Sequence, residues 1–315
     1  MSTLDAVVPW TRIVDFEVSG ISAAPWVPLA WGFLVGLVFS IVGAAGGILA
    51  SVGLISVLGV SNVNLVKPMA QMLTLISPII AVPSYYKQRR LVSSLALLLG
   101  AGGIVGALIG STLSVNYLDE LHIFKPVFGV FILLIALQLA WQLLRPMPSG
   151  STRAGRAASA FEHVIAERRP AHTLGVKQLG FSVTRCELTF GNERFDYNPW
   201  VPILAGVGIA VISSALGVGG GFLLVPFMSM VLRLPMTIVA GTAALAIFIS
   251  SVTSIGNYVR LGVELDVPLL ALMLIGTVAG SFLGPILSKY FREAWFKALL
   301  VTILALIGFR YLSAW

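Results

Sequence analysis

Charged side chains are scarce in this chain of 315 residues, since Lys, Arg, Asp and Glu together make up 10% of it. A soluble domain carries about 25% charged residues. Hydrophobic residues make up 57%, and several apolar runs reach the roughly 20 residues that a helix needs to cross a bilayer core. The shortage of charge excludes a soluble globular domain and indicates a polytopic membrane protein.

Cysteine and histidine are also rare. The single cysteine, Cys186, excludes an intrachain disulfide bond and an all-cysteine metal site. His122, His163 and His172 fall in predicted loops, with no nucleophile–base pair or metal-ligand cluster around them. The predicted spans hold no Asp, Glu or His in their middle, so we expect no proton relay made by the protein, although a substrate could carry its own proton. We therefore expect no enzyme, no metal site and no cofactor.

Two sets of four apolar segments flank a polar stretch. The segments lie at 26–60, 67–86, 91–113 and 124–144, and again at 199–234, 236–258, 267–288 and 295–314. The first 20 residues lack the basic segment and apolar core of a cleavable signal peptide. We therefore divide the chain into an N-terminal interfacial segment (1–25), a first membrane repeat (26–144), a linker or appendage (145–198) and a second membrane repeat (199–315).

The two membrane parts resemble each other at a shift of 174 residues. Gly43, Gly46 and Gly47 then fall on Gly217, Gly220 and Gly221, and a later row of glycines does the same: Gly102, Gly106 and Gly110 fall on Gly276, Gly280 and Gly284. The later glycines recur at every fourth residue, which is the small-residue pattern of closely packed membrane helices. These matches, which keep their order along the chain, predict an internal duplication.

Charge predicts the orientation of the chain in the membrane. If segment 26–60 turns back at its glycines, one side receives most of the basic loops: Lys87, Arg89, Arg90, residues 145–198, Arg233, Lys289, Arg292 and Lys297. The positive-inside rule makes that side cytoplasmic, with both termini outside, in the periplasm if the chain lies in a bacterial inner membrane. The predicted fold is an all-α polytopic membrane protein of two inverted repeats, each with a glycine-broken hairpin or re-entrant segment plus three transmembrane helices.

The polar stretch 145–198 predicts a small cytoplasmic appendage. Residues 161–169 have a helical pattern, and residues 181–197 alternate as a strand pair with Gly191-Asn192 at the turn. About fifty residues are too few to bury the core of an independent enzyme. A tether between the halves and a docking or regulatory element both stay open.

The glycine clusters 43–47 and 217–221 predict breaks within two membrane helices. Backbone groups released by a break in lipid must be buried in protein or line a polar cavity, and paired breaks in two halves indicate a transport site. Helix N-termini at the breaks offer free N–H groups to an anion. Close packing of helices through small residues is the alternative interpretation.

Polar side chains near the breaks complete the candidate site, for which a small anion is the expected ligand. Hydroxyls and amides can replace part of an anion's hydration shell, although Ser and Thr also bond to their own helix. A lysine there could attract an anion or extend to the lipid headgroups. The predicted substrate-binding residues are Ser40, Gly43, Gly46, Gly47, Lys67, Gln71, Ser213, Ser214, Gly217, Gly219, Gly220, Gly221 and Thr242. Further polar residues follow the breaks at Thr74, Ser77, Ser250, Ser251 and Ser254.

Three stretches of the sequence resemble the TauE/SafE sulfite exporter family. They are GVGGGFLLVP at 217–226, its degenerate partner GAAGGILASV at 43–52, and GTVAGSFLG at 276–284. The resemblance covers about residues 26–144 and 199–315, and the first copy departs from the pattern at Ala44 and Ala45. It implies a permease, in the direction of export, for small sulfur-containing anions such as sulfite or organosulfonates, including sulfoacetate.

Two other functions stay open on the sequence. A passive anion channel could use the same scaffold, and a membrane scaffold or sensor could work through residues 145–198. The expected partners are the anionic substrate and membrane lipids. The net charge of +7 lies in loops, and no basic-aromatic module indicates a nucleic acid. Association with further copies of the chain also stays open.

Overall fold

Long apolar helices make up most of the protein, because a chain in lipid must satisfy its own backbone hydrogen bonds. The computed structural model describes residues 13–42, 46–144, 152–166, 174–287 and 293–313. Within them, five helices are long and apolar enough to cross a membrane: α3 (Val63–Lys87), α4 (Ser93–Tyr117), α5 (Leu121–Leu144), α9 (Met236–Arg260) and α10 (Val267–Leu287). A shorter apolar stretch lies in α11 (Glu293–Ser313). The predicted all-α polytopic class is confirmed.

Each half contains a hairpin of shorter helices. In the first half, α1 (Trp26–Val42) is followed by α2 (Gly46–Val52) and the π-helix η2 (Gly53–Val57). In the second half, α7 (Trp200–Leu216) is followed by α8 (Gly221–Pro226) and the π-helix η3 (Phe227–Val231). A helix of 17 residues spans about 25 Å, less than the roughly 30 Å of a bilayer core. The lengths of the helices in each hairpin therefore favour a re-entrant hairpin over one in which both helical stretches cross the membrane.

Two helix pairs pack so closely that their backbones touch. At eight glycines of these pairs an added Cβ would meet a backbone oxygen of the neighbouring helix at 2.0–2.3 Å: Gly32, Gly36, Gly102, Gly106, Gly110, Gly206, Gly276 and Gly280. The contacts ascend in residue number along both helices, so α1 runs parallel to α10 and α4 runs parallel to α7: Gly32 with Met273, Gly36 with Thr277, Gly102 with Ile203 and Gly106 with Val207. The interpretation of the four-residue glycine rows as packing surfaces is confirmed.

The pairs α3–α9 and α5–α11 are antiparallel, whereas α4 and α9 run parallel, with Gly100 against Ile249 and Gly103 against Ser250. Tyr85, near the end of α3, lies against Gly241, near the start of α9, and Gly129 of α5 lies against Gly308 of α11. If each helix of the first half is exchanged for its counterpart in the second, the pair α1–α10 becomes α7–α4, while α3–α9 and α5–α11 are unchanged. A two-fold axis in the membrane plane gives these pairings, but the extensive contact between α4 and α9 departs from it, because the counterpart contact between α10 and α3 is much smaller. The origin of the halves by duplication stays a prediction.

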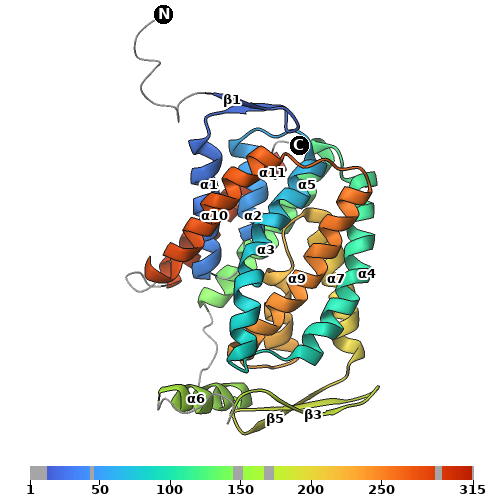
Figure 1. Ribbon diagram of the computed structural model, residues 1–315, viewed down its shortest axis with the longest axis vertical. Coiled ribbons are helices and arrows are strands. Elements are labelled where there is room, and N and C mark those ends of the chain that lie inside the picture. Colours follow the sequence, from blue (N-terminus) through green and yellow to red (C-terminus); the bar gives the residue numbers. More distant parts are fainter. Residues whose placement is uncertain (1–12, 43–45, 145–151, 167–173, 288–292, 314–315) are drawn as a thin grey trace, which may run out of the picture.

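Small polar elements cover the two ends of the helical bundle (Figure 1). At one end, β1 (Val14–Phe16) pairs antiparallel with β2 (Ile21–Ala23). At the opposite end lie α6 (Arg153–Ala166) and an antiparallel sheet of β3 (Lys177–Phe181), β4 (Cys186–Phe190) and β5 (Glu193–Tyr197).

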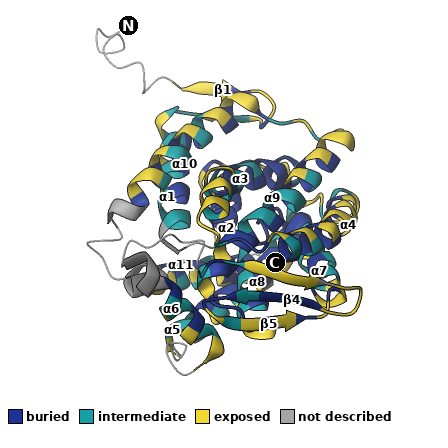
Figure 2. Cartoon of the chain, turned by 60° about the horizontal axis from the view of Figure 1, so that its bottom comes forward, coloured by how far each residue is buried: buried dark blue, intermediate teal, exposed yellow. Residues whose placement is uncertain are grey.

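The appendage bears out most of the predicted pattern. The strand pair is confirmed as β4 and β5, with left-handed Gly191 (φ 58°) and Asn192 (φ 65°) at the turn. The predicted helix starts earlier than expected, at Arg153, and β3 was not predicted because its sequence does not alternate. The sheet shares one apolar core with the bundle, where Phe195 packs in a cluster with Met228. Figure 2 shows β4 and β5 across this end of the bundle, near α8.

We expect Gly106→Ala to destabilise the protein, because the added Cβ would lie 2.2 Å from the carbonyl oxygen of Val207 and force α4 away from α7. Overpacking of this kind costs about 1–3 kcal/mol. Thermal unfolding in detergent measures the effect. Gly256→Ala is the matched control, since its Cβ would meet no atom within 4 Å. Equal melting temperatures for the two variants would contradict the packing role.

Candidate functional site

The second break is built around glycines in the left-handed conformation. Gly217 (φ 72°) ends α7, and Gly219 (φ 69°) follows two residues later. Side chains with a Cβ rarely adopt this conformation, which is why glycine ends many helices. Gly217 also packs on the backbone of Lys67, where a Cβ would lie 2.5 Å from the Lys67 Cα. The sequence therefore breaks the helix here through both its conformation and its packing.

Side chains from three other helices satisfy the last carbonyl groups of α7. Gln71 Nε2 of α3 donates to the oxygen of Ser213 at 3.4 Å, and Tyr258 Oη of α9 donates to the oxygen of Ser214 at 2.8 Å. Ser114 Oγ of α4 donates to the oxygen of Ala215 at 2.7 Å. The carbonyl side of the break is therefore held by hydrogen bonds from every neighbouring long helix of this site.

The N–H side of the same break is not held in this way. The backbone N–H groups of residues 219–222 have no acceptor among the residues that the structure describes. They precede and begin α8, where the helix dipole also favours negative charge. Four free donors in one short stretch form a surface that suits the oxygens of an anion.

A cavity of about 10 Å³, roughly the room for one water molecule, lies beside the first two of these donors, Gly219 and Gly220. It is bounded by residues of α3, α4, α7, the break and α9: Gln71, Ala107, Ala210, Ser213, Ser214, Gly219, Gly220, Ser250, Ser251 and Ser254. Gln71 is 1% exposed, and its Oε1 atom has no hydrogen-bond partner within the described chain. Ser251 is also buried, and its hydroxyl makes no hydrogen bond there. An unpaired buried polar group normally has an explanation, and a missing ligand is one.

The hydroxyl groups around the cavity are mostly used as donors elsewhere. Ser213 Oγ donates to the oxygen of Ile209 at 2.7 Å, and Ser250 Oγ lies 3.1 Å from the oxygen of Ala246. Their lone pairs stay available as acceptors. The cavity therefore presents backbone N–H donors on one side and acceptors, Gln71 Oε1 among them, on another. An oxyanion that carries one hydrogen matches this arrangement.

The first break contacts the second. A Cβ added to Gly47 would lie 2.1 Å from the carbonyl oxygen of Val218, and one added to Gly46 would lie 2.7 Å from the Phe39 ring. Both glycines are buried. The predicted site residue Gly43 lies outside the described residues. The first break therefore supports the backbone of the second, and the described cavity opens beside the second break.

Two predicted hydroxyl residues lie away from the cavity. Ser40 donates to the oxygen of Leu37 in the last turn of α1 and lies against Gly284 of α10. Thr242 donates to the oxygen of Ile238 at 2.7 Å and accepts from the N–H of Val92 at 3.1 Å. Ser40 therefore lies between the ends of α1 and α10, and Thr242 links the start of α9 to the start of α4. The polar residues that α9 does bring to the cavity are Ser250, Ser251 and Ser254, and their recurrence at three and four residues was the available signal.

Lys67 also points away from the cavity. Its Nζ atom donates to Asn64 Oδ1 at 3.1 Å and to the carbonyl oxygens of Ser114 at 3.4 Å and Leu118 at 2.6 Å. The ammonium lies 5.2 Å from the centre of the Phe124 ring. Lys67 therefore stabilises the carbonyl end of α4, a role that neither sequence interpretation contained. Its charge there also complements the helix dipole.

The sequence of the chain matches one known protein family. A family model described as sulfite exporter TauE/SafE matches residues 28–311. The chain belongs to this family. No curated protein and no solved structure matches it. Membership of TauE/SafE implies membrane transport of sulfite or related sulfur-containing anions, and the long apolar helices agree with a multi-pass membrane protein.

We expect Lys67→Met to lower thermal stability and leave substrate affinity unchanged. The substitution leaves the carbonyl group of Leu118 without its donor, whereas the Ser114 carbonyl keeps the N–H of Leu118, at a cost of about 1–3 kcal/mol. Melting temperature with and without sulfite separates the two effects. Lys87→Met, at the exposed end of the same helix, is the control. A loss of sulfite affinity at unchanged stability would assign Lys67 to the site instead.

Proposed function

We propose that the protein is a secondary transporter that exports small sulfur-containing anions, such as sulfite or sulfoacetate, by alternating access. The observation that carries this proposal is the run of four unpaired N–H groups at the second break, two of which, on Gly219 and Gly220, border a small cavity. The N–H groups of residues 219–222 bind the anion's oxygens. Gln71, Ser213, Ser214 and Ser251 complete the shell in a conformation whose cavity is wider than the described one, since about 10 Å³ holds no more than a water molecule.

The acceptor on Gln71 favours an anion in its singly protonated form. Hydrogensulfite presents one O–H group that can donate to Gln71 Oε1, while its other oxygens accept from the backbone N–H groups. Such a substrate brings its own proton, which agrees with spans that hold no acidic residue in their middle. Pairing the buried amide oxygen in this way removes the desolvation cost that it otherwise carries.

Export agrees with the charge pattern of the loops. With the basic loops in the cytoplasm of a bacterial cell, α6 and β3–β5 face the cell interior and the β1–β2 end faces the periplasm. An inside-negative potential drives an anion outward by about 2.3 kcal/mol per charge per 100 mV. A transporter of this kind needs no coupling cation to move its substrate out.

Gly220→Leu is expected to abolish transport without unfolding the protein. The backbone of Gly220 (φ −82°) accepts a side chain, and the nearest atoms to an added Cβ lie at 3.4–3.6 Å, so the break tolerates the Cβ and the rest of the leucine side chain blocks the small cavity. Uptake of sulfite, sulfoacetate, taurine, thiosulfate and sulfate into proteoliposomes measures the effect. Gly208→Leu, on the exposed face of α7 with no atom within 4 Å of its Cβ, is the control.

The same proteoliposomes distinguish the alternatives. Full transport by a folded Gly220→Leu protein would contradict the site. Saturable uptake with counterflow is expected of a carrier, and currents that grow in proportion to voltage would instead assign a passive channel. Removal of residues 152–197 should leave residual flux in a transporter, whereas a scaffold or sensor that works through the appendage would lose its function.

Gln71→Leu should weaken sulfite transport and remove its dependence on the proton of the substrate. For the wild type, we expect faster transport at fixed total sulfite as the pH falls, because the hydrogensulfite fraction rises. The variant loses a hydrogen bond to a charged ligand, worth about 1.5–3 kcal/mol, or roughly a 10- to 150-fold rise in KM. Gln88→Leu, beyond the end of α3, is the control. An unchanged pH profile in Gln71→Leu would reject the protonated substrate.

A further inference from the structure

In each hairpin the second helical stretch, α2–η2 or α8–η3, ends in the same kind of turn. Leu58 N–H donates to the oxygen of Gly53, and Leu232 N–H donates to the oxygen of Phe227, at the same shift of 174 residues. The residue that follows is left-handed in both halves, but it is Gly59 (φ 77°) in the first and Arg233 (φ 53°) in the second. Arginine is strained in this conformation and glycine is not. The turn itself therefore gives no reason for an arginine.

A large cavity adjoins Arg233. It has a volume of about 1050 Å³ and lies between α6, β5, the end of η3 and the start of α9. Arg153 and Arg233 contribute positive charge to its wall, beside the N-terminal turn of α6, whose Gly155 N–H already donates to Thr152 Oγ1. Roughly 300–1,000 Å³ is typical of sites for small organic ligands. The cavity is separate from the transport site and shares no residue with it.

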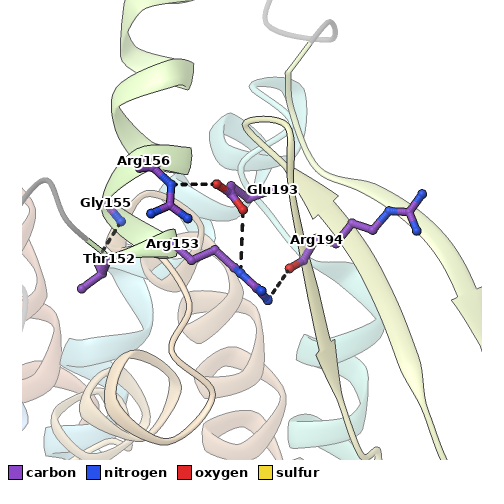
Figure 3. Close-up of polar contacts among 6 residues, drawn as sticks. All are labelled: Thr152, Arg153, Gly155, Arg156, Glu193 and Arg194. Atoms are coloured by element: carbon purple, nitrogen blue, oxygen red, sulfur yellow. Dashed lines mark hydrogen bonds and ion pairs between the residues drawn. The ribbon is translucent and has the colours of Figure 1, made fainter.

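The acidic groups near the cavity are already paired, and Arg233 is not. Glu193 is shared by two arginines, with its carboxylate oxygens 2.9 Å from Arg156 Nε and 3.7 Å from Arg153 Nε (Figure 3). The Asp196 carboxylate lies 3.3 Å from Arg185 Nη2. Arg233 forms no ion pair or hydrogen bond with any residue that the structure describes. Burial raises the pKa of the Tyr197 phenol to about 12, so this wall residue is neutral. The cavity therefore has an excess of positive charge.

The cavity lies at the boundary of the apolar part of the bundle. Exposed apolar side chains of its wall, Val231 and Met236, continue onto the helix surface, and Trp200 lies exposed beside the wall residue Val201. Tryptophan gathers at membrane–water interfaces, and basic pockets at the cytoplasmic side of membrane helices bind phosphate headgroups. We propose that this cavity binds the phosphate headgroup of an anionic phospholipid between Arg233 of the hairpin and Arg153 of the appendage.

The bound headgroup links two parts of the chain. Arg153 is the first residue of α6, where its Nη1 atom also donates to the oxygen of Arg194 (Figure 3), and Arg233 follows the hairpin whose tip forms the transport site. An anionic lipid therefore fixes the appendage to the hairpin. This proposal does not rest on the transport function, because lipid binding is measured without any substrate.

The experiment measures the affinity of the full-length protein for phosphatidylglycerol by native mass spectrometry, and its melting temperature in nanodiscs of phosphatidylcholine with and without phosphatidylglycerol. Arg233→Gly is expected to lose affinity for phosphatidylglycerol by about fivefold and to stay folded in pure phosphatidylcholine, because glycine suits the turn. Arg233→Lys should keep most of the preference, and high salt should weaken it.

Arg89→Gly is the matched control. Arg89 is also left-handed (φ 57°) and exposed, but it does not line the cavity. The Arg89→Gly protein should likewise lose the strain of a left-handed arginine, and it should keep the preference for phosphatidylglycerol. An Arg233→Gly protein with unchanged affinity would overturn the proposal. If glycerol 3-phosphate or inorganic phosphate stabilised the protein and phosphatidylglycerol did not, the ligand would be a soluble phosphate. That result would overturn the lipid assignment.

Discussion

A helix that breaks inside a membrane leaves carbonyl and N–H groups that water cannot reach, and each unpaired group costs several kcal/mol. The second hairpin meets this constraint on one side of its break only. Gln71, Tyr258 and Ser114 satisfy the final carbonyl groups of α7, whereas the N–H groups of residues 219–222 keep no acceptor in the described structure. The remaining donors favour an anion over a cation as the ligand that we propose for this site.

The glycine rows and the carbonyl caps depend on each other. A serine side chain is short, so Ser114 can reach the oxygen of Ala215 only because α4 touches the backbone of α7 through Gly106 and its neighbours. The equivalent pair, α1 and α10, shows the same combination, with Thr277 Oγ1 3.1 Å from the oxygen of Gly32. One pattern of small residues therefore allows both the close packing of the helices and the hydrogen bonds to the carbonyl groups at the break. The same pattern positions the wall of the cavity.

The sequence predicts the features that local chemistry determines. Left-handed Gly217 and Gly219, the four-residue glycine rows and the turn at Gly191-Asn192 each follow from residues that are neighbours along the chain. The direction of a polar side chain is different, because it depends on which helix end lies nearby. Lys67 turns to the end of α4 and Thr242 to its start, and neither contact has a signal in the sequence. The hydropathy of the sequence places both residues on membrane helices, but it does not show which neighbouring helix each side chain contacts.

The two halves share a scaffold but only some of their polar residues: the cavity serines Ser214 and Ser251 have the counterparts Ser40 and Ser77, and the others differ. At the shift of 174, Gln71 and Lys67 of α3 correspond to Leu245 and Gly241 of α9, while Ser250 and Ser254 of α9 correspond to Ile76 and Ile80 of α3. The cavity at the second break draws its acceptor from one helix and its hydroxyls from the other. A symmetric scaffold that carried symmetric residues would present two equal sites. Divergence of the polar residues instead concentrates the donors and acceptors at one break, which supports the proposal of a single anion site where the two hairpins meet.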